Sequence, residues 1–138
     1  MDVEYKVNSP ITSGQFIQLL KKSTLAERRP TDDIECIDGM LANSNLIVTA
    51  WVDNELVGIA RSITDFHYAC YLSDLAVSEV FQRKGIGKRL QVITQGQLKP
   101  HCKLILLASP TANQYYKQIG FTNNQRCWVL NRNVSINK

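Results

Sequence analysis

The strongest chemical signal in the sequence is a short basic run that contains two glycines, Gln82-Arg83-Lys84-Gly85-Ile86-Gly87. It follows an apolar, β-rich segment and precedes a stretch with helical periodicity. Because glycine has no Cβ, Gly85 and Gly87 allow the backbone to approach a ligand closely. The first N–H groups of a helix have no partner within the helix and carry partial positive charge. The run therefore predicts a site for a phosphate-like anion at a helix N-terminus.

Four cations lie at or beside this predicted helix start: Arg83, Lys84, Lys88 and Arg89. Cations at this end oppose the helix dipole and cost about 0.3–1 kcal/mol each when exposed. A sequence selected only for stability would place acidic residues there. A bound polyanion would reverse the sign of this energy. The alternative interpretation is a solvated basic turn without a ligand.

Two common phosphate-binding loops do not match the run. A P-loop requires GxxxxGK[ST], but Gln82 and Arg89 stand where glycine and Ser/Thr should be. The dinucleotide-binding pattern GxGxxG fails because Leu90 takes the place of the third glycine. What remains is the pattern Gln-x-x-Gly-x-Gly, preceded by Leu75-Ala76-Val77.

A second pattern lies downstream, in the run Ala112-Asn113-Gln114-Tyr115-Tyr116-Lys117-Gln118-Ile119-Gly120-Phe121. The first pattern resembles the pyrophosphate loop of the GNAT superfamily of N-acetyltransferases. The second resembles the A-x-x-[aromatic]-Y-x-x-x-G-F segment of the same superfamily, with its spacing kept. The resemblance covers roughly residues 46–121, and it indicates a small single-domain member of that superfamily.

The resemblance implies that acetyl-CoA is the co-substrate, held in a cleft where two parallel strands, residues 71–77 and 103–108, splay apart. The implied contacts come from a strand end, the glycine run and three downstream positions: Leu75, Ala76, Val77, Gln82, Arg83, Lys84, Gly85, Ile86, Gly87, Lys88, Ser109, Ala112 and Tyr116. Family members often carry an asparagine where Ser109 stands.

The resemblance also implies direct attack of a neutral amine on the thioester. A backbone N–H near Leu75 would stabilise the oxyanion, and Tyr116 would give a proton to the departing CoA thiolate. The alternative for Tyr116 is a core aromatic on an amphipathic helix. Some relatives carry a glutamate that acts as the general base at the position of Tyr71, so this chain has no carboxylate there. Two alternatives for the general base are left: a loop side chain, such as Asp65 or His67, or a chain of water molecules.

Acceptor specificity is expected from the N-terminal helical segment and the central hairpin. The candidate lining residues are Arg28, Arg29, Trp51, Arg61 and Asp65. Arg61 falls in the middle of a predicted strand, where an unpaired buried charge is costly. Its alternatives are an exposed face or a salt bridge with a nearby carboxylate. An arginine that lines a pocket would favour an acceptor carrying a carboxylate or a phosphate.

The elements that must position these residues follow from periodicity and turn signals. Strands are expected at residues 3–7, 46–52, 55–63, 71–77, 103–108 and 127–131, and helices at 13–24, after the N-cap candidates at 31–33, from 86 to about 99, and after Ser109-Pro110 up to Gly120. The order β-α-α-β-β-β-α-β-α-β predicts an α/β (α+β) fold. It would hold a mixed, mostly antiparallel sheet with a central splayed parallel pair and helices on both faces.

Composition bounds the protein class. The 138 residues predict a single domain, with 44% hydrophobic and 20% charged residues. No apolar run reaches membrane-spanning length and no apolar leader opens the chain, so we expect a cytoplasmic protein without a membrane partner. The four cysteines form no CxxC pair, which favours small buried thiols over a metal or disulfide framework.

The leading hypothesis is an N-acetyltransferase that moves an acetyl group to the amine of a small molecule or a peptide. The alternative is a non-catalytic CoA-binding sensor or regulatory domain. The net charge of +4 is too weak and dispersed to indicate a nucleic-acid partner, and Phe81 is the one aromatic residue near the basic run. The resemblance also allows a homodimer.

Overall fold

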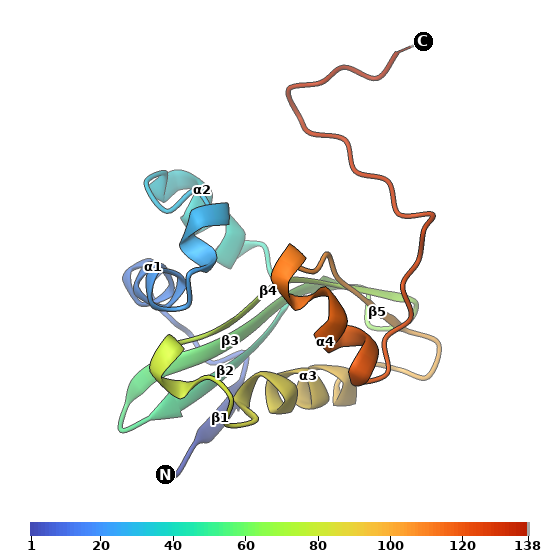
Figure 1. Ribbon diagram of the computed structural model, residues 1–138. Coiled ribbons are helices and arrows are strands. Elements are labelled where there is room, and N and C mark those ends of the chain that lie inside the picture. The colour runs from blue at the N-terminus through green and yellow to red at the C-terminus, as the bar shows by residue number, and fades with distance from the viewer. Residues whose placement is uncertain (138) are drawn as a thin grey trace. The chain divides into compact units, whose positions relative to one another are not determined.

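A five-stranded sheet organises the first of two units into which the chain folds, Met1–Leu106 (Figure 1). The structure is a computed structural model and describes residues 1–137. The strands are β1 Glu4–Val7, β2 Leu46–Val52, β3 Glu55–Thr64, β4 Ala69–Val77 and β5 Lys103–Ile105, in the order β1-β2-β3-β4-β5. All neighbours are antiparallel except β4 and β5, which run parallel. The predicted mixed sheet is confirmed.

The hairpin of β2 and β3 forms where the sequence predicts it. Its two-residue turn has positive φ at both positions, 49° at Asp53 and 65° at Asn54. Asn and Asp tolerate this left-handed conformation, and its twist matches that of the flanking strands. The turn sets Val52 opposite Glu55 and thereby the register of the hairpin.

Strand β4 departs from its neighbours on both sides. Arg61 of β3 pairs with Asp74, but Ser62 pairs with Leu72, so Ser73 is an extra residue in β4 and forms a bulge. On the other side, the parallel pairing with β5 ends at Tyr71. The edge of β4 beyond Tyr71 therefore has no strand beside it among the paired residues of the described chain.

Helices cover both faces of the sheet, as Figure 1 shows. On one face lie α1 Ser13–Lys22 and α2 Ile34–Ala42, joined through a 3₁₀ turn, η1, at Leu25–Arg28. On the other lies α3 Ile86–Gly96. Thr12 and Gln15 form a capping box on α1, and the Asp33 side chain caps α2, as its N-cap candidacy predicted.

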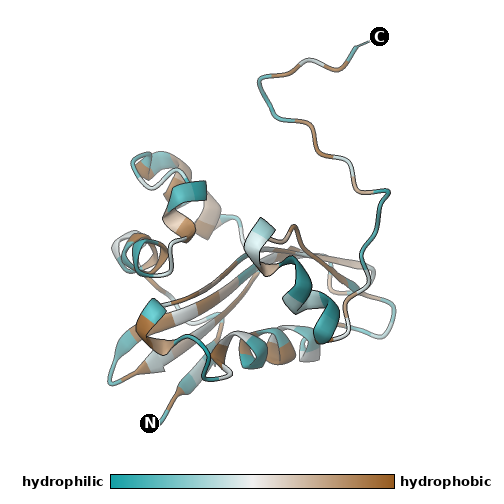
Figure 2. Cartoon of the chain, viewed as in Figure 1, coloured by the Kyte–Doolittle hydropathy of each residue, from teal (hydrophilic) through white to brown (hydrophobic). Residues whose placement is uncertain are grey.

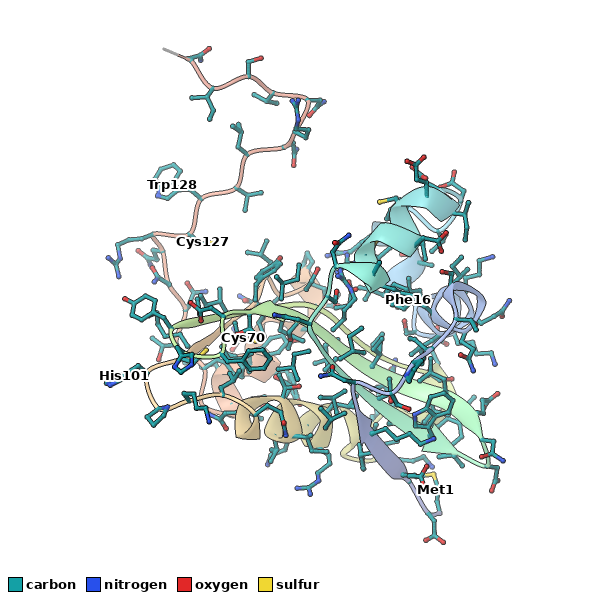
Figure 3. All side chains as sticks on the ribbon, turned by 180° about the vertical axis from the view of Figure 1, so that it is seen from behind. Met1, Phe16, Cys70, His101, Cys127 and Trp128 are labelled. Atoms are coloured by element: carbon teal, nitrogen blue, oxygen red, sulfur yellow. The ribbon has the colours of Figure 1, made fainter. Side chains whose placement is uncertain are left out.

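Each face has its own apolar core. Phe16, Leu19 and Leu20 of α1 are buried against β2 and β3 residues such as Ile59 (Figure 3). Ile86 and Leu90 of α3 are buried against the opposite face. In Figure 2, hydrophobic residues, in brown, lie along the sheet, and the loop that leads into α3 contains hydrophilic residues, in teal.

Gly58 lets α3 approach the sheet closely. A Cβ at Gly58 would lie 3.1 Å from Leu90 Cδ1 and 3.2 Å from Ile86 Cγ2. A larger residue would push the start of α3 away from the sheet. The position of the glycine run therefore depends on a backbone-to-helix contact in the middle of β3.

The second unit begins at Leu107 and contains a 3₁₀ turn, η3 Pro110–Ala112, and the helix α4 Asn113–Gln118. Gly120 has φ of 105°, and its N–H donates to Lys117 O at 3.3 Å while the Phe121 N–H donates to Tyr116 O at 3.0 Å. This pair of bonds is a Schellman motif, in which glycine supplies the left-handed residue. The predicted glycine stop is confirmed, and Ser109 occupies the N-cap position before Pro110.

Two strand predictions are wrong. Residues 127–131 form no strand, and the side chain of Trp128 is 90% exposed (Figure 3). The strand predicted at 103–108 ends at Ile105, which is 41% exposed, so it is not buried on both faces. The parallel pair consequently lies at an edge of the described sheet and not at its centre.

The cysteines are less uniform than expected. Cys70 is buried, Cys102 is partly buried, and Cys36 and Cys127 are exposed. Across residues 1–137, no cluster of three or more His, Cys, Asp or Glu side chains could hold a metal ion. Within the same range, no helix has the length and apolar character needed to cross a membrane.

Candidate functional site

The glycine run connects the end of β4 to the start of α3. The Ser78 N–H donates to Val57 O at 2.9 Å, which ends the ladder with β3, and a 3₁₀ turn follows at Glu79–Phe81. The Gln82 side chain then turns back, and its Nε2 donates to Val77 O at 2.9 Å. This bond ties the loop to the strand, so the structure gives the Gln82 side chain a role in shaping the loop.

The turn into α3 uses two left-handed residues. Arg83 has φ of 63° and Gly85, the N-cap of α3, has φ of 84°. Glycine adopts this conformation without strain, whereas a left-handed arginine costs about 1–2 kcal/mol. Residues 82–85 are exposed, so this strained turn is held at the surface.

Six successive backbone N–H groups in this turn have no protein acceptor within residues 1–137: those of Arg83, Lys84, Gly85, Ile86, Gly87 and Lys88. The first paired N–H in the helix is that of Arg89, which donates to Gly85 O at 3.0 Å. A Cβ at Gly85 would meet nothing within 4 Å, and one at Gly87 would meet only Val77 Cγ2, at 3.7 Å. The donors are therefore open, as a diphosphate site requires.

The open edge of β4 adds a second set of backbone groups. Hydrogen-bonded pairs alternate along an antiparallel ladder, and Ser78 donates to Val57. The N–H and C=O groups of Val77 and Leu75 therefore point away from β3. The bond from Gln82 to Val77 O agrees with this orientation. Beyond Tyr71, where the pairing with β5 ends, an extended ligand could hydrogen-bond to the Leu75 N–H.

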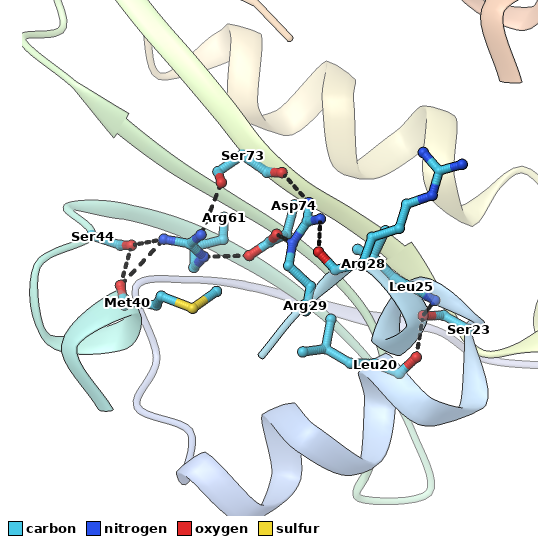
Figure 4. Close-up of polar contacts among 10 residues, drawn as sticks. All are labelled: Leu20, Ser23, Leu25, Arg28, Arg29, Met40, Ser44, Arg61, Ser73 and Asp74. Atoms are coloured by element: carbon cyan, nitrogen blue, oxygen red, sulfur yellow. Dashed lines mark hydrogen bonds and ion pairs between the residues drawn. The ribbon is translucent and has the colours of Figure 1, made fainter. Parts of the chain in front are cut away.

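Asp74 and its partners lie on the α1–α2 face of β4 (Figure 4). The Asp74 side chain is fully buried and forms ion pairs with Arg29 and Arg61. Arg61 is 3% exposed and also donates to Met40 O, Ser44 Oγ and Ser73 Oγ. The prediction that Arg61 lines an acceptor pocket is therefore not supported. The alternative salt bridge is what the structure shows.

The other acceptor candidates have separate positions. Trp51 is 9% exposed in the core, with its Nε1 donating to Thr49 Oγ1 at 2.8 Å, so an acceptor-lining role is not supported for it either. Arg28 is exposed at the end of η1. Asp65 is exposed, and the pKa of its carboxyl is lowered chiefly by hydrogen bonds from the Tyr68 and Ala69 N–H groups. Asp65 thus stabilises its own turn.

Tyr116 lies on α4 in the second unit. Its ring packs edge-on against Tyr115, with centroids 5.2 Å apart, and against Phe121, at 5.4 Å. Burial, followed by the neighbouring Tyr115, raises the pKa of the Tyr116 hydroxyl. The group is therefore a protonated donor at neutral pH. Ser109 and Ala112, the other candidates in this unit, are partly buried.

The family assignment follows from a domain match over most of the chain. A family model described as an acetyltransferase (GNAT) domain matches residues 20–129. The chain therefore belongs to the GNAT acetyltransferase family.

Two relatives agree with this class. An uncharacterised N-acetyltransferase, ycf52, of Gracilaria tenuistipitata var. liui is 29% identical over 123 residues, which cover 83% of this chain and 68% of the relative. Its counterpart from Pyropia yezoensis is 26% identical over 122 residues, with 80% and 68% covered.

Solved structures share the fold. A GNAT-family acetyltransferase from Streptococcus pneumoniae TIGR4 superimposes with a TM-score of 0.77 at 21% identity, covering 95% of this chain and 99% of the other. The aminoglycoside N-acetyltransferase AAC(6')-Iy, solved in complex with CoA, superimposes with a TM-score of 0.72 at 18% identity, covering 96% of each chain.

Within the first unit, the structure places the outward backbone groups of Leu75 and Val77 on the open edge of β4 and the unpaired N–H groups of residues 83–88, as far as residues 1–137 show, in the loop that follows this strand. The contributions of Ser109, Ala112 and Tyr116 to the same site stay predictions. The sequence interpretation missed the importance of Ser73 and Asp74. The one usable signal in the sequence was Asp74 itself, an acidic residue whose side chain strand alternation places on the face of β4 opposite to the expected ligand.

Proposed function

We propose that this protein is an acetyl-CoA-dependent N-acetyltransferase that transfers an acetyl group to a primary amine of a small molecule or peptide. The observation that carries the proposal is the row of N–H groups at residues 83–88, six donors for which the described residues provide no acceptor, in a chain of the GNAT acetyltransferase family. Such donors at a helix N-terminus match the charge and the closely spaced oxygens of a diphosphate.

The proposed binding mode uses groups that the chain leaves open. The N–H groups of residues 83–88 hold the pyrophosphate of CoA, and the Arg83 and Lys88 side chains add cationic contacts with its phosphates. The outward Leu75 C=O and Val77 N–H hold the pantetheine arm as an added strand would be held. Ser109 and Ala112 complete the proposed cofactor contacts on the downstream segment.

The proposed chemistry divides between a backbone donor and a side chain. The Leu75 N–H stabilises negative charge on the thioester oxygen as the amine attacks, an effect that can be worth about 3 kcal/mol. Tyr116 donates a proton to the thiolate that leaves. The raised pKa of its hydroxyl supports this role, because the group stays protonated over the physiological range.

The nature of the acceptor rests on related proteins. An aminoglycoside acetyltransferase from a soil metagenomic sample was solved in complex with sisomicin, at a TM-score of 0.65 and 20% identity. AAC(6')-Iy was also solved in complex with the bisubstrate analogue CoA-S-monomethyl-acetylneamine. These structures support an amine as the acceptor class. Aminoglycosides are a sensible first set in an acceptor screen.

Binding and turnover should be measured separately. Thermal unfolding with acetyl-CoA should show a concentration-dependent rise in Tm, since a ligand that binds only the folded state stabilises it. Pantetheine, which lacks the diphosphate, is the matched control and should stabilise far less. Equal stabilisation by both, or none by either, would contradict the binding mode.

An amine screen with acetyl-CoA, read as released thiol, tests the reaction. We expect thiol release that depends on both the amine and the protein. Acetyl-CoA binding with no transfer to any small amine or peptide would instead favour the alternative, a CoA-binding sensor or regulatory domain.

A further inference from the structure

The bulge in β4 immediately precedes the proposed oxyanion donor and is held by two arginines (Figure 4). Ser73 is the extra residue of the bulge. Arg29 Nη2 donates to Ser73 O at 2.8 Å, and Arg61 Nη2 donates to Ser73 Oγ at 2.9 Å. Both polar groups of the bulge residue that accept hydrogen bonds are therefore fixed by a guanidinium.

Asp74 completes the cluster. Its Oδ1 accepts from Arg29 Nε and its Oδ2 accepts from Arg61 Nε. The carboxylate is fully buried, so it is shielded from an incoming amine and both of its oxygens are already engaged. Asp74 thus lies one residue from Leu75 and serves as a buried anchor, in an arrangement unsuited to a general base.

The two arginines reach the bulge from separate parts of the first unit. Arg61 belongs to β3 and also binds the end of α2 through Met40 O and Ser44 Oγ. Arg29 follows η1, and its N–H donates to Ala26 O at 3.2 Å. The cluster therefore joins β3, β4, α2 and the segment after α1 at a single carboxylate.

We propose that Arg29 and Asp74 are positioning residues, which hold the Ser73–Asp74 bulge so that the Leu75 N–H points at the thioester oxygen. This inference rests on the proposed acetyl transfer and assigns its geometry to a buried ion cluster. A bulge re-aims the residues beside it. A free carbonyl and hydroxyl at Ser73 would let the strand relax toward regular pairing and turn the next N–H away from the open edge.

Arg29 offers the sharper test, because its side chain is 22% exposed whereas that of Arg61 is 4% exposed. Arg29→Ala leaves a space that guanidinium ion from solution can enter at millimolar, non-denaturing concentrations. Arg29→Lys retains a cation for Asp74 but cannot supply the planar fork that also reaches Ser73 O. The matched control is Lys22→Ala, which also removes a cation from a carboxylate, the exposed Glu55 at 3.2 Å.

Three readouts separate positioning from folding. Amide NMR should show the Leu75 resonance moved in Arg29→Ala, with those of Gly85 and Gly87 unmoved. The affinity for CoA, measured by calorimetry, should match that of the wild type. Turnover of acetyl-CoA with the best amine of the screen should fall about 10- to 100-fold in kcat, the size expected for a misplaced reacting group.

Guanidinium, but not sodium chloride at the same ionic strength, should return the Leu75 resonance and restore kcat in Arg29→Ala. Arg29→Lys should fold and bind CoA like the wild type and still show reduced kcat. Lys22→Ala should change none of these quantities.

The proposal is overturned if the Leu75 amide and kcat of folded Arg29→Lys match the wild type, or if guanidinium restores stability without restoring either. If wild-type protein transfers no acetyl group, the function proposed above fails. The NMR comparison still decides the positioning inference, because it requires no acceptor.

Discussion

Two polar regions flank Leu75 on β4, and they differ in how completely they are satisfied. On one side, the loop at residues 82–88 exposes six backbone donors that have no acceptor in the described part of the chain, residues 1–137. On the other, the Asp74 carboxylate is fully buried, and each of its oxygens is paired with a guanidinium, that of the buried Arg61 or of the partly exposed Arg29.

The difference indicates that the loop after β4 and the ion cluster on β4 have different roles. Exposed N–H groups can bind water, so leaving them unpaired costs little until a ligand replaces that water. A buried carboxylate cannot be left unpaired without a large penalty, so its partners hold one geometry. The loop is therefore suited to binding an external anion and the cluster to maintaining the shape of the strand.

The largest expected effect comes from breaking the buried cluster. Asp74→Ala leaves two arginines without their carboxylate and should lower the free energy of unfolding by about 3–5 kcal/mol. Denaturant unfolding measures this loss. The control is Glu55→Ala, which removes an exposed partner of Lys22 and should cost no more than about 1 kcal/mol. Similar losses in the two variants would contradict the comparison.

A second expected effect tests whether binding and chemistry are separate. Tyr116→Phe should lower kcat by about 10²-fold while the affinity for CoA is kept, because only the proposed acid is lost. Since burial raises the pKa of Tyr116, wild-type turnover should decline only when the pH exceeds the ordinary tyrosine value of about 10, where the phenol loses its proton. Tyr115→Phe is the neighbouring control. Unchanged kcat in Tyr116→Phe would remove the acid role.

A third, smaller effect separates backbone strain from ligand approach at Gly85. Gly85→Ala forces a Cβ residue into φ of 84° and should cost about 1–2 kcal/mol of stability. Gly85→Asn tolerates that conformation better and should be closer to the wild type. In both variants the new Cβ enters space that the protein leaves empty and that the proposed CoA pyrophosphate would occupy, so both should weaken CoA binding. If the asparagine variant binds CoA like the wild type, glycine is required for its φ alone.

The smallest expected effect has opposite signs for folding and binding. Lys88→Glu places an anion in the first turn of α3 and should raise the stability of the ligand-free protein by about 0.3–1 kcal/mol. The same change should weaken CoA binding, because it repels the diphosphate. Gln95→Glu, at the other end of α3, should lower stability slightly and leave CoA binding unchanged. A loss of stability in Lys88→Glu would contradict the idea that Lys88 destabilises the ligand-free protein and is retained for binding an anion.

Much of the fold and of the loop could be predicted from local sequence. The Asp53-Asn54 turn, the Asp33 cap and the Gly120 stop were predictable because each depends on the backbone preferences of one or two residues. The strand at 127–131 was not, because an apolar run forms a strand only where a neighbouring strand completes its hydrogen bonds.

The glycine run, its basic neighbours and the helix that follows could be predicted from the sequence alone, since all of them lie within residues 82–96. The ion cluster became visible only in the folded protein, because Arg29 and Asp74 are 45 positions apart and Arg61 and Asp74 are 13 apart. Whether Arg61 contacts an acceptor or anchors the structure depends on which side chains lie opposite it in the sheet. Side-chain partners across strands are set by register and bulges, which short-range patterns do not encode.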